Sequence, residues 1–247
     1  MPIKSIEQTL NKEFPKITPV KENMEIHIPD IIDGIPNRNG FIWALNGSGG
    51  SGKSSLMLNF FKSGHLYRNK FNNIFYICPM ASFLSVEDHP FSEHEEGRVF
   101  HELTEDVLES IYDELKIRKT EKEKPEYSIV IVDDMADSLK QNDIQKKLNQ
   151  MLMKARHLQC AFVFLAQAYY YLPKILRKQL TNITIFKPKN AEEWSSIAKE
   201  LLHMNKDDGN TVYDYVYSEP YSHLDIDTVD NKYYKNFNLL TFHTGTK

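Results

Sequence analysis

The chain has 247 residues, 41% of them hydrophobic and 12% aromatic, which is enough to build one sizeable core. Its formal net charge of −4 at pH 7 excludes a global attraction to nucleic acid, so any such contact needs a local basic surface. The two cysteines, Cys78 and Cys160, lie in apolar runs and predict buried thiols in a reducing compartment. No apolar run reaches membrane-spanning length and the N-terminus has no signal-peptide core, so we expect a soluble, intracellular protein.

The hydrophobic pattern predicts strands and helices that alternate along the chain. Helical spacing over residues 3–14 and apolar–polar alternation over residues 20–28 predict an N-terminal helix and strand. Short apolar runs then predict strands at residues 41–46, 74–78, 128–133, 161–166 and 183–186. Helical patterns fall at residues 53–63, 99–117, 138–156 and 191–202. The alternation over residues 211–217 and 233–242 predicts a C-terminal β-hairpin.

A glycine-rich loop of the form G-x-x-x-x-G-K-S joins the strand at residues 41–46 to the next helix. Its residues are Gly47, Ser48, Gly49, Gly50, Ser51, Gly52, Lys53, Ser54 and Ser55. Glycines let consecutive N–H groups turn toward an anion, and the helix N-terminus adds partial positive charge there. We expect Lys53 to contact the β- and γ-phosphates and Ser54 to bind Mg²⁺. A Gly/Ser-rich turn that happens to contain a lysine is the alternative, but the flanking strand and helix favour a nucleoside triphosphate site.

Polar residues follow two of the predicted buried strands. Asp133 ends the run at residues 128–133, and a carboxylate at the carboxyl edge of a parallel sheet is suited to hold Mg²⁺ directly or through water. Asp134 is placed to deprotonate the attacking water, or alternatively to cap the helix that follows. Gln167 follows residues 161–166, and its amide can contact both a γ-phosphate oxygen and the water. An ordinary strand-end glutamine is the alternative for that residue.

An ordered set of motifs gives the chain a more specific resemblance. These motifs are the phosphate loop, Val132-Asp133-Asp134, Arg156-His157, Phe164-Leu165-Ala166-Gln167, Leu172-Pro173-Lys174-Ile175-Leu176-Arg177 and Thr184-Ile185-Phe186-Lys187. Over roughly residues 40–202 the chain resembles the genome-packaging ATPases of large DNA viruses and virophages, the poxvirus-like branch of the FtsK–HerA superfamily. The resemblance implies an α/β P-loop NTPase fold with a mainly parallel five-stranded core sheet flanked by helices.

The resemblance also implies how the chain works and with what. We expect ATP and Mg²⁺ as cofactors, ATP hydrolysis coupled to translocation of double-stranded DNA, and a homo-oligomeric ring, a pentamer or a hexamer. The ring would dock on a capsid vertex or portal in the host cytoplasm, at a viral factory, with virion association as a further option. We expect an N-terminal extension at residues 1–39, the ATPase core at 40–203 and a hairpin-like extension at 204–247.

Rings of this kind need an arginine from a neighbouring subunit to stabilise charge on the γ-phosphate. Arg156 precedes the strand at residues 161–166, so it should lie at the edge of the sheet away from its own nucleotide and reach a neighbour's. Arg177 follows Gln167 and could act within its own subunit or in the next one. Surface contacts or contacts with the DNA backbone are the alternatives for both arginines.

Basic residues gather between residues 140 and 189, where Asp143 is the only acid. They are Lys140, Lys146, Lys147, Lys154, Arg156, Lys174, Arg177, Lys178, Lys187 and Lys189. Such a surface can follow a phosphate backbone, or it can be a solvated helical face. A nucleotide or small-molecule kinase is a second function that would use the same loop, but no arginine-bearing lid is evident. A cellular-type DNA pump or helicase and a non-hydrolysing nucleotide switch are further alternatives, and Asp134 with Gln167 argues against the switch.

Overall fold

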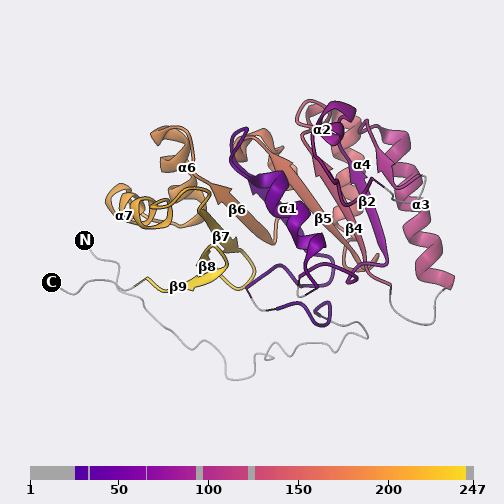
Figure 1. Ribbon diagram of the computed structural model, residues 1–247, viewed down its shortest axis with the longest axis horizontal. Coiled ribbons are helices and arrows are strands. Elements are labelled where there is room, and N and C mark those ends of the chain that lie inside the picture. The colour runs from indigo at the N-terminus through magenta and orange to yellow at the C-terminus, as the bar shows by residue number, and fades with distance from the viewer. Residues whose placement is uncertain (1–25, 33, 65, 93–96, 122–125, 243–247) are drawn as a thin grey trace, which may run out of the picture.

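The computed structural model describes residues 26–242, apart from residues 33, 65, 93–96 and 122–125. In this part of the chain a single mixed sheet has the strand order β3-β2-β4-β5-β1-β6-β7-β8-β9 (Figure 1). The strands are β1 (Ile42–Asn46), β2 (Asn73–Ile77), β3 (Val99–Phe100), β4 (Ser128–Asp133), β5 (Cys160–Ala166), β6 (Asn182–Phe186), β7 (His223–Asp227), β8 (Lys232–Lys235) and β9 (Asn238–Leu240). The helices are α1 (Lys53–Lys62), α2 (Met80–Leu84), α3 (Glu105–Glu121), α4 (Asn142–Leu152), α5 (Lys174–Arg177), α6 (Ala191–Leu201) and α7 (Lys206–Val216).

The first six strands are parallel, and the last three run antiparallel on from β6. The predicted α/β class and five-stranded parallel core are confirmed, with the two-residue strand β3 as a short addition. β1 lies between β5 and β6, and β4 lies beyond β5. Every residue of β1, β4 and β5 is buried, which explains why these strands read as continuous apolar runs.

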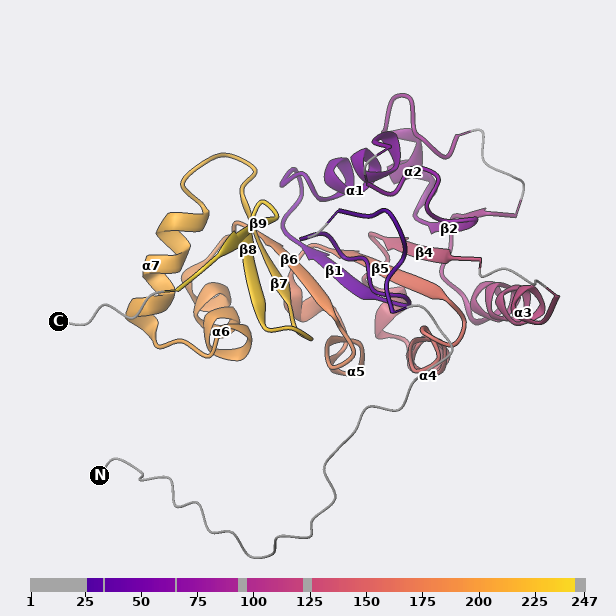
Figure 2. The same cartoon turned by 90° about the horizontal axis from the view of Figure 1, so that it is seen from below.

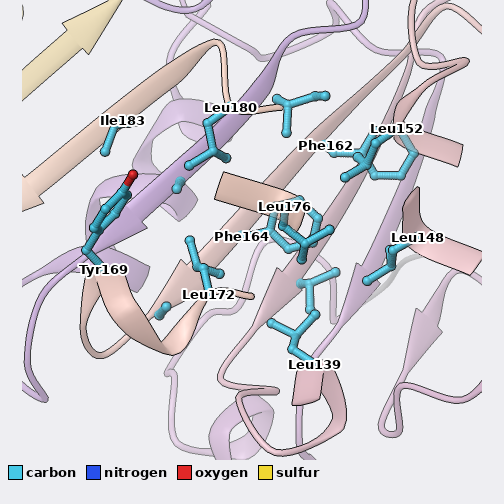
Figure 3. Close-up of a cluster of buried hydrophobic side chains, with 14 of the residues drawn as sticks. Leu139, Leu148, Leu152, Phe162, Phe164, Tyr169, Leu172, Leu176, Leu180 and Ile183 are labelled. Atoms are coloured by element: carbon cyan, nitrogen blue, oxygen red, sulfur yellow. The ribbon is translucent and has the colours of Figure 1, made fainter. Parts of the chain in front are cut away.

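Helices cover both faces of the sheet. Figure 2 shows α1 on one side and α3 to α6 on the other. The side chains of β5 alternate between the two layers: Val163 packs with Met57 of α1, whereas Phe162 and Phe164 pack on the α4 side. Figure 3 shows that second layer, where β5 meets residues of α4 and α5 such as Leu148 and Leu176. Both cysteines are buried free thiols, as predicted.

The C-terminal segment differs from the prediction. Residues 211–217, predicted as a strand, fall mainly in α7, whose first turn is capped by the Asn205 side chain accepting from two backbone N–H groups. Helix α7 packs against α6, and the Trp194 indole donates to the Gly209 carbonyl at 3.1 Å. The strands of the C-terminus are β7, β8 and β9, a three-stranded antiparallel extension of the main sheet rather than a separate hairpin.

The other predicted helices and strands differ less from those in the structure. The helix predicted at residues 138–156 is a 3₁₀ turn (Ser138–Lys140) followed by α4, and that predicted at 99–117 is β3 followed by α3. The N-terminal helix at residues 3–14 lies outside the described residues, as does most of the strand at 20–28, of which the described end makes one bridge from His27 to Arg38. Among the described helices, none is both long enough and apolar enough to cross a membrane.

Candidate active site

The phosphate loop connects the carboxyl end of β1 to the amino end of α1. Gly47 donates its N–H to the Ala166 carbonyl of β5 at 3.1 Å, which anchors the loop on the sheet. A Cβ on Gly47 would lie 2.7 Å from the Phe186 Cβ, so no larger residue fits there. Gly52, at the N-cap of α1, has φ +101°, a left-handed conformation that strains residues with a side chain. These two glycines therefore explain the spacing of the motif.

Lys53 is the first residue of α1, and its side chain points back toward the phosphate loop. Its Nζ donates to the carbonyl oxygens of Gly47 at 2.5 Å and of Ser48 at 3.1 Å. Burial lowers the pKa of the Lys53 ammonium, and the charges of Asp133 and Asp134 act in the opposite direction. The ammonium is thus held at the loop, close to two carboxylates, and its contact with the β- and γ-phosphates remains a prediction.

Ser54 and Asp133 meet at the carboxyl edge of the sheet. The Ser54 hydroxyl donates to Asp133 Oδ2 at 3.0 Å, which joins the phosphate loop to the end of β4. Tyr76 of β2 donates its hydroxyl to the same oxygen, also at 3.0 Å. Burial raises the pKa of the Asp133 carboxyl, while the hydrogen bonds from Ser54 and Tyr76 favour its charged form.

Tyr76 was not predicted as a site residue. The available signal was a hydroxyl-bearing residue inside the apolar run at residues 74–78, on a strand that turned out to pair with the one that ends at Asp133. The run alone does not reveal which strands are neighbours.

Asp134 and Gln167 lie together at the same edge. Gln167 Nε2 donates to Asp134 Oδ1 at 3.2 Å, although the two residues are far apart in sequence. Asp134 is exposed and has φ +55°, a left-handed conformation that turns the chain directly after β4. The 3₁₀ turn that follows has Asp137 at its N-cap position, so nothing supports the alternative of Asp134 as a helix cap. The catalytic roles of Asp134 and Gln167 remain predictions.

The two arginines are not part of this cluster. Arg156 is exposed in the turn before β5, where its backbone N would lie 2.5 Å from a Cβ on Gly40, just ahead of β1. It therefore lies at the amino edge of the sheet, opposite the phosphate loop, as the sequence predicted. Arg177 is held within its own chain: its Nη1 contacts both Glu200 carboxylate oxygens, at 3.0 and 3.2 Å, and its guanidinium stacks on Tyr169 and Tyr170. For both arginines, stabilisation of charge on the γ-phosphate bound by a neighbouring subunit remains a prediction.

Two hollows flank the phosphate loop. One, of about 460 Å³, lies between the loop and residues 217–222; the other, of about 340 Å³, lies beside Asn46 and Gln167. Asn46 is only 1% exposed, and neither polar atom of its side chain has a hydrogen-bond partner among the described residues. Asn46 was not predicted as a site residue; the available signal was a polar residue that ends the apolar run before the loop.

Only some of the basic side chains predicted at residues 140–189 are exposed for contact with a DNA backbone, because others are engaged within the chain. Lys147 is buried and pairs with Glu109 of α3, and Lys154 donates to the Tyr112 hydroxyl at 2.7 Å. The acidic helix α3 therefore neutralises part of α4, which the sequence did not predict. Lys174 and Lys178, at the two ends of α5, are exposed.

A guanine-binding signature has the form Asn-Lys-x-Asp, and the chain contains that pattern at residues 205–208. In the structure Asn205 caps α7 through its side-chain oxygen, while its Nδ2 donates to Asp208 Oδ2 at 2.7 Å. The two side chains that would recognise guanine are engaged with each other and with the helix. The pattern is a helix start in this protein.

The chain matches the family described as Poxvirus A32 protein over residues 36–207. Among solved structures it is similar to the DNA-packaging ATPase B204 from Sulfolobus turreted icosahedral virus, at 18% identity and a TM-score of 0.59, covering 83% of this chain and 98% of that one. It is also similar to the genome-packaging NTPase B204 from Sulfolobus turreted icosahedral virus 2 in complex with ATP-γS (19% identity, TM-score 0.57, covering 82% and 100%). A third similar structure is EssC (ATPases 2 and 3) from Geobacillus thermodenitrificans (18% identity, TM-score 0.55, covering 81% and 40%).

The comparison with curated proteins gave no match. The structural similarities, all below 25% identity, show a shared fold. The family match covers most of the chain and contains Lys53, Ser54, Asp133, Asp134 and Gln167. The chain belongs to the Poxvirus A32 protein family, and it shares its fold with solved packaging ATPases.

Proposed function

We propose that this protein is an ATP-driven translocase of double-stranded DNA that packages a viral genome into a preformed capsid. The observation that carries the proposal is the 3.0 Å contact of Ser54 with Asp133 beside the phosphate loop, in a chain of the A32 family. The B204 proteins of the same fold are described as DNA- or genome-packaging enzymes, and one is in complex with ATP-γS. These descriptions support the same activity here.

The loop and Lys53 would bind the phosphates. Successive loop N–H groups and the start of α1 give a site for an anion, and the Lys53 ammonium adds a full positive charge. The Ser54 hydroxyl and the Asp133 carboxylate are hard oxygen donors already in contact, which fits Mg²⁺ held by one carboxylate and substrate phosphates. When bound, the ion neutralises charge that develops on the phosphates.

Hydrolysis would then depend on Asp134 and Gln167. Asp134 accepts the proton of the attacking water, and its exposure leaves it accessible to solvent at the edge of the sheet. Gln167 orients Asp134 through its Nε2, so its amide oxygen can accept a hydrogen bond from the same water. A water held between the two groups would be aligned with the γ-phosphate.

Coupling to DNA would require a ring of identical subunits. Arg156 lies at the amino edge of the sheet, so it can reach only a nucleotide bound by another subunit. Each site would be composite, with Lys53 from one subunit and Arg156 from the next. The assembly that we propose is a pentamer or hexamer docked at a capsid vertex or portal and working in the host cytoplasm.

The test is ATP turnover by purified protein with and without double-stranded DNA. We expect release of inorganic phosphate that double-stranded DNA stimulates, and no turnover in the Lys53→Ala variant. A rate of phosphate release that is the same with and without double-stranded DNA would rule out a translocase. Formation of ADP without free phosphate, dependent on an added nucleotide acceptor, would indicate a kinase. Strand displacement on a forked duplex would indicate a helicase.

A further inference from the structure

The larger hollow beside the phosphate loop lies on the side away from Asp133. It has a volume of about 460 Å³ and lies between the loop and the segment from Tyr217 to Ser222 that leads into β7. In the sheet, β4 and β6 lie on opposite sides of β1. Ser54 and Asp133 mark the β4 side, whereas Phe186, at the end of β6, lines the hollow.

This arrangement fixes the direction of a bound triphosphate. The γ-phosphate end must point toward Ser54, Asp133 and Gln167, since these residues form the hydrolytic edge. The α-phosphate and the nucleoside must then leave the loop on the β6 side. The hollow lies where the nucleoside would emerge.

Two aromatic rings are available at that point. A Cβ on Gly52 would lie 3.5 Å from a ring carbon of Tyr221 and 3.6 Å from one of Phe186, so both rings flank the loop where α1 begins. Tyr221 is 73% exposed, which leaves its ring surface open to a ligand. It also has φ +62°, an unfavourable conformation for a bulky residue, and such strain is often retained at binding sites.

Buried hydroxyls line the same hollow. Ser222 is only 3% exposed, yet its Oγ has no hydrogen-bond partner among the described residues. Ser51 of the loop is half-buried, and its buried Oγ also has no partner there. Buried polar atoms are normally paired, so two orphaned hydroxyls in one hollow indicate a polar ligand. Ribose and base edges offer the missing donors and acceptors.

The segment that carries these groups is held in place from two sides. Tyr217 donates its hydroxyl to the Ile185 carbonyl of β6 at 3.0 Å. Lys235 of β8 donates to the Ser218 Oγ at 2.9 Å and to the Tyr215 carbonyl at 3.0 Å. The hollow is therefore already formed, and a ligand would not have to order it.

We propose that this hollow is the nucleoside subsite, in which the base of ATP stacks on Tyr221 and Ser222 forms a hydrogen bond with the nucleoside. The inference rests on the proposed function but goes beyond it. The family match ends at residue 207, so Tyr221 and Ser222 lie in the C-terminal part of the chain outside the match, whereas Phe186 and Ser51 lie inside it. The chain beyond that match would then be part of the enzyme's active site.

The test separates the nucleoside from the phosphates. Binding of AMPPCP and of tripolyphosphate, each with Mg²⁺, is measured by calorimetry for wild type, Tyr221→Ala and Tyr221→Phe. Tyr221→Ala should weaken AMPPCP binding by about ten-fold, since stacking is lost, and leave tripolyphosphate binding unchanged. Tyr221→Phe keeps the ring and should bind both as wild type does. Leu84→Ala, which removes an equally exposed side chain outside the hollow, is the control and should also bind both normally.

Two results would overturn the subsite. One is unchanged AMPPCP binding by Tyr221→Ala while Lys53→Ala loses both ligands; the proposed function would survive that result. The other is an equal loss of AMPPCP and tripolyphosphate in Tyr221→Ala, which would show that the ring only supports the loop. Failure of the wild-type protein to bind either ligand would instead overturn the proposed function together with the subsite.

Discussion

A buried hydrogen-bonded chain joins the phosphate-loop strand to the C-terminal strands. The Trp43 indole of β1 donates to the Thr184 hydroxyl of β6 at 3.0 Å, and that hydroxyl donates to Asp225 Oδ1 of β7 at 2.7 Å. Asp225 is also contacted by His223 Nδ1 at 2.9 Å and by the Phe237 N–H at 2.9 Å. Thr184 is the link between β1 and β7, so we predict that Thr184→Val destabilises the whole fold.

The expected loss follows from the two hydrogen bonds of one hydroxyl. Valine fills the same space, so packing changes little. A hydrogen bond to a charged group contributes about 1.5–3 kcal/mol, and an indole N–H left buried without a partner costs about 1–3 kcal/mol. Because relaxation recovers part of this, we expect a loss of about 3 kcal/mol. Such a loss is a large part of the roughly 5–15 kcal/mol that stabilises a typical domain.

The assay is urea unfolding followed by circular dichroism. Thr184→Val should lower the transition midpoint in one cooperative step with an unchanged slope, because β7 unfolds together with the parallel core. Thr211→Val is the control: this threonine is exposed on α7, where its hydroxyl donates to the Asp207 carbonyl, and it should change stability by under about 0.5 kcal/mol. A loss below about 1 kcal/mol for Thr184→Val would refute the reasoning, and two separate transitions would show that the C-terminal strands fold as their own domain.

Further predictions concern the site. Lys53→Ala should abolish ATP binding in a nucleotide-binding assay, because the charge beside the phosphates is lost; near-normal turnover would remove the phosphate-loop assignment. Asp134→Asn should bind ATP but hydrolyse it about 10²–10⁴-fold more slowly, and a parallel collapse of binding would make Asp134 a metal ligand instead. Charge reversal at Lys174 and Lys178 should lower DNA affinity and flatten its salt dependence, whereas an unchanged salt slope would place the contact elsewhere. Arg156→Ala rings should regain turnover when mixed with Lys53→Ala subunits; mixtures that assemble but stay inactive would exclude action across the interface.

The sequence was sufficient for the parallel core and for the residues at its carboxyl edge. Runs such as residues 128–133, rich in β-branched residues, favour strands covered on both faces, and parallel strands end at one edge. Asp134 and Gln167 each follow such a run, so the sequence places both at the carboxyl edge, whereas their 3.2 Å contact also depends on β4 and β5 being neighbours. Local pattern and topology agree there, which makes the prediction robust.

The sequence was not sufficient where distant side chains decide the outcome. Residues 211–217 alternate and are rich in tyrosine and valine, which favours a strand, yet the rings of Tyr213 and Tyr217 pack on Trp194 of α6 at 5.4 and 5.8 Å. Packing of one face against α6 and the Asn205 cap overrode the local preference. The same holds for Lys147: nothing near it in sequence indicates that Glu109, on another helix, neutralises it.

The position of Phe186 links the C-terminal strands to the nucleotide. Its Cβ limits Gly47 at one end of the phosphate loop and its ring lies beside Gly52 at the other, while the same ring contacts His223 of β7 at 5.2 Å. A displacement of β7 would therefore press on the loop through a single side chain, because a packed interior transmits small shifts. Phe186→Ala should therefore loosen the phosphate loop and weaken binding of AMPPCP with Mg²⁺ in calorimetry, and unchanged binding would show that the loop does not depend on this contact.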